Sequence, residues 1–168
     1  GDHRGLHSFP TRRSSDLVED VVGKVVQEYG RIDIGVFSAG INVRDRNWNN
    51  ISIEGWDSVI NIDLSGAFYC CQAVLPTMRN QGGGLIMNIS SMAAKSVGKL
   101  TGPGYTSAKH AMNAMTASLL LVSINSGLSS TALSPAQVPT PLLHLHLTRL
   151  PSRHFSLSSA VFSLHLLL

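Results

Sequence analysis

Short apolar runs of strand length alternate along this chain with longer segments of helical periodicity, and this alternation constrains the fold most. Three runs of strand length are bounded by polar, glycine or proline residues: 32–37, 85–89 and 130–133. Three other segments repeat apolar residues at helical spacing: 18–29, 56–78 and 105–122. Near-continuous apolar strands that alternate with helices are typical of parallel sheets with right-handed crossovers. The sequence therefore predicts an α/β fold built on a parallel sheet.

Start and stop signals agree with these segments. Gly30 follows the first helical segment and suits a C′ position, where glycine tolerates a left-handed backbone. Ser52 can cap the second helix, with Glu54 in its first turn. In parallel sheets, ligands bind at the carboxyl ends of the strands. We expect three loops to converge there: 38–40, 90–91 and 135–136.

The two ends of the chain are expected to lie outside the domain. Residues 1–17 back-translate, apart from one base, to a common sequencing-library adapter, although a natural disordered basic tail remains the alternative. Residues 143–168 are mostly Leu, Ser and His and resemble a frameshifted read. His144 and His146 have no neighbouring Cys or carboxylate, so we predict no metal site. One partial domain is therefore predicted over 18–142.

Charge and cysteine usage limit the partners. The net charge is +3, yet every acidic residue lies at or before Asp63, and no Lys/Arg cluster is interleaved with aromatics, which argues against nucleic acid. No charge-free apolar run has the length of a membrane span. Cys70 and Cys71 are adjacent in an apolar segment and are interpreted as buried thiols in a reducing compartment, which indicates a cytoplasmic location.

Three polar residues form the candidate reaction centre. Tyr105 and Lys109 stand four apart on one predicted helix, so their side chains share a face. An ammonium beside a phenol favours the phenolate, which suits the tyrosine to acid/base work. Ser91, just after a strand, could hydrogen-bond the oxygen of a carbonyl or an alcohol. These groups would suffice for hydride transfer beside a nicotinamide, which carries the hydride.

Several segments jointly resemble the short-chain dehydrogenase/reductase family over 18–142. IDIGVFSAG resembles its Asn-Asn-Ala-Gly strand, and WDSVINIDLSGAFYCCQAVLPTM resembles its long interface helix. GGGLIMNISSMAA and GYTSAKHA resemble its Ser and Tyr-x-x-x-Lys region, and STALSPAQVPTP its Pro-Gly segment. The resemblance implies a partial Rossmann-type, doubly wound parallel sheet without the first βαβ unit. It also implies an NAD- or NADP-dependent oxidoreductase acting on a small alcohol or carbonyl substrate, and a homo-oligomer.

The family's roles carry over to matching positions. Tyr105 matches the acid/base, Lys109 the residue that binds the nicotinamide ribose, and Ser91 the substrate-orienting serine. Asp63 falls where the family's proton-relay asparagine stands, so it is either a holder of the relay water or a helix-kink residue with no catalytic part. The implied cofactor contacts, besides Tyr105 and Lys109, are Ala39, Gly40, Pro135, Val138 and Thr140.

Other departures bear on activity. Phe37-Ser38 replaces Asn-Asn, Ala136 replaces the usual glycine, and the Gly-rich phosphate loop that normally cradles the pyrophosphate is missing. Gly82-Gly83-Gly84 cannot replace that loop because it precedes a strand rather than opening a helix. We therefore expect the chain as written to bind cofactor poorly and to be inactive. Two alternatives to the enzyme stay open: a non-catalytic scaffold acting through its helices, and a truncated fragment that does not fold stably.

Overall fold

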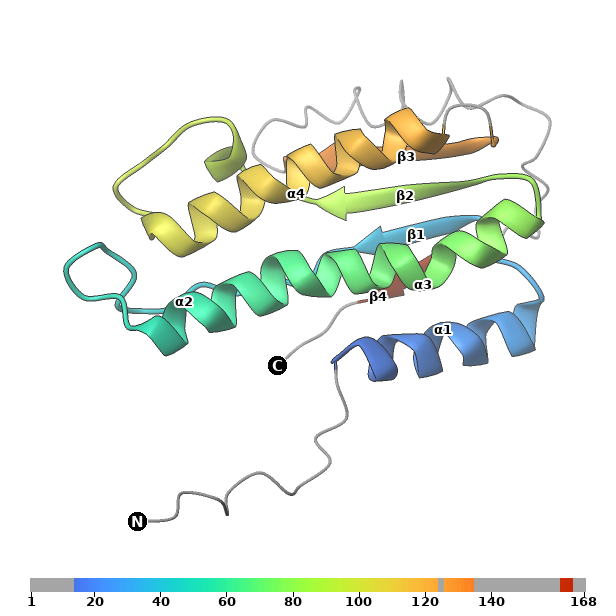
Figure 1. Ribbon diagram of the computed structural model, residues 1–168, viewed down its shortest axis with the longest axis horizontal. Coiled ribbons are helices and arrows are strands. Elements are labelled where there is room, and N and C mark those ends of the chain that lie inside the picture. Colours follow the sequence, from blue (N-terminus) through green and yellow to red (C-terminus); the bar gives the residue numbers. More distant parts are fainter. Residues whose placement is uncertain (1–13, 124–125, 135–160, 165–168) are drawn as a thin grey trace, which may run out of the picture.

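The computed structural model describes residues 14–123, 126–134 and 161–164. Four strands and four α-helices, with two short helical turns, follow one another along the chain (Figure 1). The elements are α1 Ser14–Tyr29, β1 Ile34–Phe37, α2 Ile53–Ile60, the π-helical turn η1 Asn61–Ser65, α3 Gly66–Asn80, β2 Gly84–Ile89, the 3-10 turn η2 Met92–Ala94, α4 Gly102–Ser123, β3 Leu128–Leu133 and β4 Val161–Leu164.

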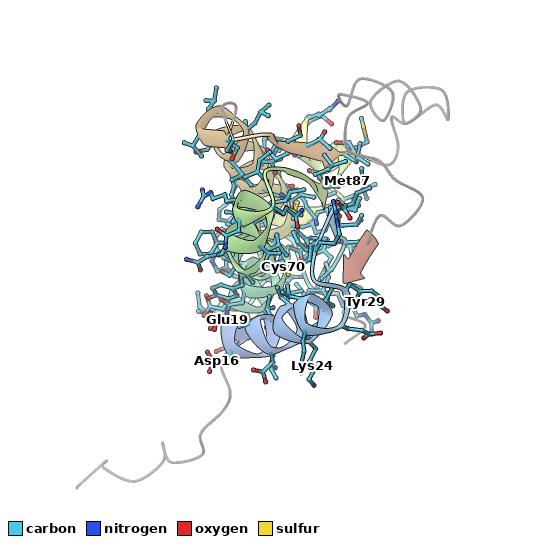
Figure 2. The ribbon with its side chains drawn as sticks, turned by 90° about the vertical axis from the view of Figure 1, so that its right-hand side faces the viewer. Asp16, Glu19, Lys24, Tyr29, Cys70 and Met87 are labelled. Carbon is cyan, nitrogen blue, oxygen red and sulfur yellow. The ribbon has the colours of Figure 1, made fainter. Side chains whose placement is uncertain are left out.

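The strands form one parallel sheet in the order β3-β2-β1-β4. In β1 and β2, Ile34 pairs with Leu85 and Phe37 with Asn88, so the carboxyl ends of these strands lie side by side. Strands β2 and β3 are also parallel. The described helices lie on one face of this sheet (Figure 1, Figure 2). The predicted α/β fold with a parallel sheet is confirmed.

The core lies between this helical layer and the sheet. Alternate residues of β1 and β2, among them Phe37 and Ile86, point into it. Helix α3 supplies Val74 and Met78, which are fully buried. Both cysteines are also buried there, and burial raises the pKa of Cys70 to about 12 and that of Cys71 to about 11. Such thiols stay protonated and packed, as the sequence predicted.

The helix limits follow local chemistry. The left-handed backbone of Gly30, with φ 73°, ends α1 as predicted, and its N–H donates to the Val26 carbonyl. Ser52 Oγ accepts the Gly55 N–H at 3.0 Å, which confirms the predicted cap. Helix α1 begins at Ser14, four residues before the predicted start. Ser14 and Leu17 share a helical face with Val18 and Val21, and all four line one hollow.

The segment from Ile53 to Asn80 is one continuous helix interrupted by the π-turn η1. By length and composition alone it could also cross a membrane, a test that the core helices of soluble proteins often pass. Here it packs against β1 and β2, and it buries Asp63 within η1. Its buried face therefore serves the core of this fold.

Strand β4 lies in the segment for which the sequence predicted no element. It pairs in parallel with β1, from Val161 beside Ile34 to Leu164 beside Phe37. The edge of β1 opposite β2 is therefore covered by backbone from the chain's own end. The predicted assignment of 1–17 and 143–168 to foreign or misread sequence stays a prediction.

Two glycines, one inside α1 and one just beyond its end, test the helix assignment. Gly23 lies inside the helix with open space where a Cβ would stand, so Gly23→Ala should raise the free energy of unfolding by about 0.5–1 kcal/mol. Gly30→Ala should lower it, because alanine must adopt a positive φ. Urea unfolding followed by circular dichroism measures both. Equal effects of the two substitutions would contradict the helix end at Tyr29.

Candidate active site

The candidate site lies where β1 and β2 end and α4 begins. The turn 38–40 follows β1, Ser90 and Ser91 follow β2, and α4 carries Tyr105 and Lys109. Because β1 and β2 are parallel and in register, their following loops open at the same edge of the sheet. The predicted convergence of loops 38–40 and 90–91 is confirmed. The third predicted loop, 135–136, lies outside the described residues, as do Pro135, Val138 and Thr140.

Lys109 is the centre of this arrangement, and its side chain is only 3% exposed. The ammonium donates to the Ile89 carbonyl, at 3.3 Å, where β2 ends. It also lies 5.5 Å from the centroid of the Tyr105 ring, so the shared helical face predicted for these two residues is confirmed. An ammonium this close to an aromatic ring is attracted to its face.

Asp63 lies opposite Lys109 and is completely buried. Its Oδ1 accepts the backbone N–H of Ile41 at 2.7 Å. Its Oδ2 lies 3.5 Å from Lys109 Nζ, an ion-pair distance, and has no hydrogen-bond partner among the described residues. The two buried charges therefore compensate each other, as buried charges must.

Gly40 packs against this ion pair from the β1 side. A Cβ at this position would stand 3.2 Å from Asp63 Oδ2 and 3.2 Å from Lys109 Nζ. The backbone of Gly40 is not in the positive-φ region. The site therefore needs glycine here because of close approach, and not because of a special backbone conformation.

Burial and mutual attraction act in opposite directions on this pair. Burial raises the pKa of Asp63, while the Ile41 N–H and the Lys109 ammonium partly offset the rise. Burial lowers the pKa of Lys109, while the Asp63 carboxylate partly offsets the fall. Relative to the unfolded chain, the fold thus loses stability as pH rises through the Asp63 titration, and it regains stability as pH rises through that of Lys109.

Ser91 caps the short turn η2. Its Oγ accepts the N–H of Ala93 at 3.2 Å, and its own carbonyl accepts a hydrogen bond from the Ser134 hydroxyl at 3.2 Å. Among the described residues Oγ only accepts, so its hydroxyl proton is available to an acceptor outside the turn. Ser91 stands two residues beyond Ile89, the residue that holds the Lys109 ammonium.

Tyr105 is half-buried near the start of α4. The preceding Gly104 is buried against Val59 of α2, where a Cβ would meet Val59 and Ile51 at 3.6 Å. The turn η2, which follows Ser91, also packs against α4. The first turn of α4 is therefore fixed from two sides, which fixes the tyrosine backbone as well.

Ala39 lines a hollow of about 290 Å³ between α1, the end of β1 and the start of α3. Its walls are mostly apolar, and four of the wall residues, Ser14, Leu17, Val18 and Val21, come from α1. Phe37 points into this wall, and the Oγ of Ser38 is buried without a hydrogen bond in the described part of the chain. Phe37 and Ser38 therefore supply no side-chain amide at this strand end.

Sequence reasoning missed the backbone groups of the site. The Ile41 N–H and the Ile89 carbonyl hold Asp63 and Lys109, yet backbone groups leave no signal in side-chain patterns. Asn88 could be found as a polar residue in an apolar strand. Its amide donates to Thr116 Oγ1 at 2.9 Å and ties β2 to α4, which is a structural role. The described residues hold no cluster of three or more His, Cys, Asp or Glu suited to a metal ion.

Comparison with known families gives one consistent answer. The family model described as short chain dehydrogenase matches residues 10–148. The 3-oxoacyl-[acyl-carrier-protein] reductase of Thermotoga maritima is 38% identical over 130 residues, which cover 76% of this chain and 51% of the relative. A 3alpha-hydroxysteroid dehydrogenase of Mediterraneibacter gnavus is 33% identical over 111 residues, which cover 66% of this chain and 44% of the relative.

Solved structures agree with the sequence matches. Levodione reductase superposes with a TM-score of 0.69 at 28% identity, covering 71% of this chain and 46% of that chain. The structure titled ElxO with NADP bound gives a TM-score of 0.68 at 27% identity, covering 71% of this chain and 48% of that chain. The chain thus spans about half the length of the proteins it matches.

A methyl group at position 40 tests the ion-pair geometry. Gly40→Ala should force Asp63 or Lys109 to move and should lower the free energy of unfolding by about 1–3 kcal/mol, as overpacking does. Gly98→Ala is the matched control, since nothing lies within 4 Å of its Cβ position and its effect should stay within about 0.5 kcal/mol. Chemical denaturation measures both changes. A neutral Gly40→Ala would show that the pair is not packed under this turn.

Proposed function

This chain belongs to the short-chain dehydrogenase family, and we propose that Ser91, Tyr105 and Lys109 form the reaction centre of an NAD(P)-dependent oxidoreductase. The substrate class is a small alcohol or carbonyl compound. The observation that carries the proposal is the Lys109 ammonium, held by the end of β2 and placed 5.5 Å from the Tyr105 ring. The proposal concerns the complete protein, of which this chain covers about half by comparison with its relatives.

The residues present fit part of an NAD(P) molecule. Ala39, beside Gly40 at the end of β1, opens onto an apolar hollow that could take a flat ring. Lys109 offers an ammonium donor to a ribose hydroxyl. Pro135, Val138 and Thr140 are proposed contacts on the nicotinamide side. Bound NAD(P) supplies or accepts the hydride.

Tyr105 is proposed to move the proton. In reduction of a carbonyl its hydroxyl protonates the developing alkoxide, and in oxidation the phenolate takes the alcohol proton. The Lys109 ammonium, whose charge is buried and little screened, lies 5.5 Å from the centroid of the tyrosine ring.

Ser91 is proposed to hold the substrate oxygen. Its hydroxyl proton is available because Oγ acts only as an acceptor, for the Ala93 N–H, among the described residues. Donation to a carbonyl oxygen would orient the substrate and stabilise the charge that develops there. The rigid strand end and the cap of η2 keep this donor in place.

Asp63 keeps two open interpretations from the sequence: a holder of a relay water, or a helix residue without a catalytic part. Its direct pairing with Lys109 supports a role that acts on the lysine. The location is proposed to be cytoplasmic, and the complete protein is proposed to be a homo-oligomer. The exposed Ile53 and Phe68 on the long helix are candidates for its interface.

A non-catalytic scaffold is the second candidate. The observation that favours it is the ion pair of Asp63 with Lys109, whose ammonium the enzyme would use. Titration of NADH or NADPH with the complete protein, followed by nicotinamide fluorescence, separates the two. A scaffold gives no binding, whereas the enzyme gives saturable binding that weakens when Lys109→Met removes the ammonium.

Removal of one hydroxyl tests the reaction centre. In the complete gene product, Tyr105→Phe should lower turnover by about 10²–10⁴-fold, because the proton donor is lost while the ring and its packing remain. Tyr29→Phe, the same change on the exposed end of α1, should leave turnover unchanged. Oxidation of NADPH or NADH, followed at the nicotinamide absorbance band with a panel of small ketones, gives the rates. Unchanged turnover in Tyr105→Phe would refute the assigned role.

A further inference from the structure

We propose that Asp63 is a positioning residue whose carboxylate fixes the Lys109 ammonium between the ends of β1 and β2. Within the proposed function, on which only the consequence for the cofactor rests, this sets the direction in which Lys109 can offer its remaining N–H donors. The carboxylate does not touch the reacting atoms in this role. It acts through the lysine.

The contacts of Asp63 join three parts of the fold. Its Oδ1 is held at 2.7 Å by the Ile41 N–H, just beyond the turn that follows β1. Its Oδ2 faces Lys109 Nζ at 3.5 Å, and that ammonium donates to the Ile89 carbonyl at the end of β2. One side chain in η1 thus connects the turn after β1 with α4, and through the lysine with β2. Movement of any of these parts would change the position of the ammonium.

A neutral amide would satisfy only half of these contacts. The bond to Ile41 needs one acceptor oxygen, which asparagine also has. With that oxygen turned toward Ile41, the amide NH₂ of asparagine would face the ammonium, donor against donor. The carboxylate instead presents its second oxygen to the lysine. The contact with Lys109 is therefore the part of the geometry that requires a charge at position 63.

The donors of Lys109 can be counted. An ammonium has three N–H donors. One is used by the Ile89 carbonyl, and the positive charge faces Asp63 Oδ2 at an ion-pair distance without a hydrogen bond. The position of Gly40, whose Cβ would stand 3.2 Å from the nitrogen, leaves little room for the ammonium to shift. Asp63 and Ile89 together therefore decide the direction of the donors that remain.

Few charges compete with this pair. Among the described residues, Asp63 from η1 and Tyr105 from α4 are the titratable side chains that face the ammonium, and β2 contributes the Ile89 carbonyl. Both members of the pair are buried, so salt screens their attraction little. Removal of the carboxylate should therefore change the ionisation of the lysine strongly, because the ammonium would stay buried without a counter-charge.

The test follows the lysine itself, in this chain and without cofactor. The sequence has four lysines, of which Lys24, Lys95 and Lys99 are exposed. The protein is labelled with ¹³C at lysine Cε, and the Lys109 signal is assigned by its loss in Lys109→Met. This signal should titrate at a lower pH than the signals of the other three lysines. In Asp63→Asn its midpoint should fall by a further 1–3 pH units, about the effect of losing an opposite charge at this range. Asp57→Asn, which removes an exposed carboxylate from α2 of the same continuous helix, should leave the midpoint unmoved.

Two results would overturn the proposal. One is a Lys109 signal that titrates together with the exposed lysines. The other is an Asp63→Asn midpoint equal to that of the unmodified chain. If Asp63→Asn does not fold, the unmodified chain still tests the proposal. The chemical shift of the Ile41 amide proton should report the protonation of Asp63, and the chemical shift of the Lys109 signal should change in a step at the same pH. Absence of that shared step also overturns the proposal.

Failure of this proposal is distinguishable from failure of the proposed function. The titration concerns two side chains and needs neither cofactor nor turnover. If the complete protein binds no NADPH or NADH but Lys109 shows the shifted titration, the positioning role stands and the oxidoreductase function is refuted. If the complete protein turns over substrate but Asp63→Asn leaves the Lys109 midpoint unchanged, the oxidoreductase function stands and the positioning role is refuted.

Discussion

A buried ammonium is the constraint on which the site depends. Lys109 is almost wholly excluded from water, and an isolated charge in that position would cost several kcal/mol. The surrounding chain compensates it with the carboxylate of Asp63 and the carbonyl of Ile89. The carboxylate in turn is compensated by the Ile41 N–H. Each partner belongs to a different element, so the requirement to pair one charge specifies how β1, β2, η1 and α4 meet.

The parallel sheet makes this meeting possible. Because β1 and β2 are in register, the turn 38–40 and the Ser90-Ser91 segment leave the sheet at one edge. Helix α4, which crosses from β2 to β3, brings Tyr105 and Lys109 back over that edge. Asn88 anchors α4 deeper in the core through Thr116. The chemistry at the strand ends therefore rests on a packed layer that does not itself take part.

The sequence predicted the elements well because their signals are local. The apolar spacing of α1, the cap at Ser52 and the stop at Gly30 depend on neighbouring residues, and each is confirmed. The shared face of Tyr105 and Lys109 follows from helix geometry alone. What the sequence could not reveal depends on contacts between distant segments. The direct contact between Asp63 and Lys109 required a distance, and β4 required knowing which edge of β1 was open. The roles of the site residues stay predictions.

The π-turn explains how a charged residue could enter an apolar helix face. The buried residues Val59, Asp63, Ala67 and Cys71 recur every four positions. In an α-helix such a row drifts by about 40° per step, since each residue turns the helix by about 100°. It would soon leave the sheet. In η1, the Gly66 N–H reaches back five residues to the Asn61 carbonyl, which widens this turn. The drift is thereby reduced where Asp63 stands, and the carboxylate stays in line with the apolar row on either side. A regular α-helical turn at 61–65 would rotate Asp63 or the start of α3 away from the core, and Lys109 would lose its counter-charge.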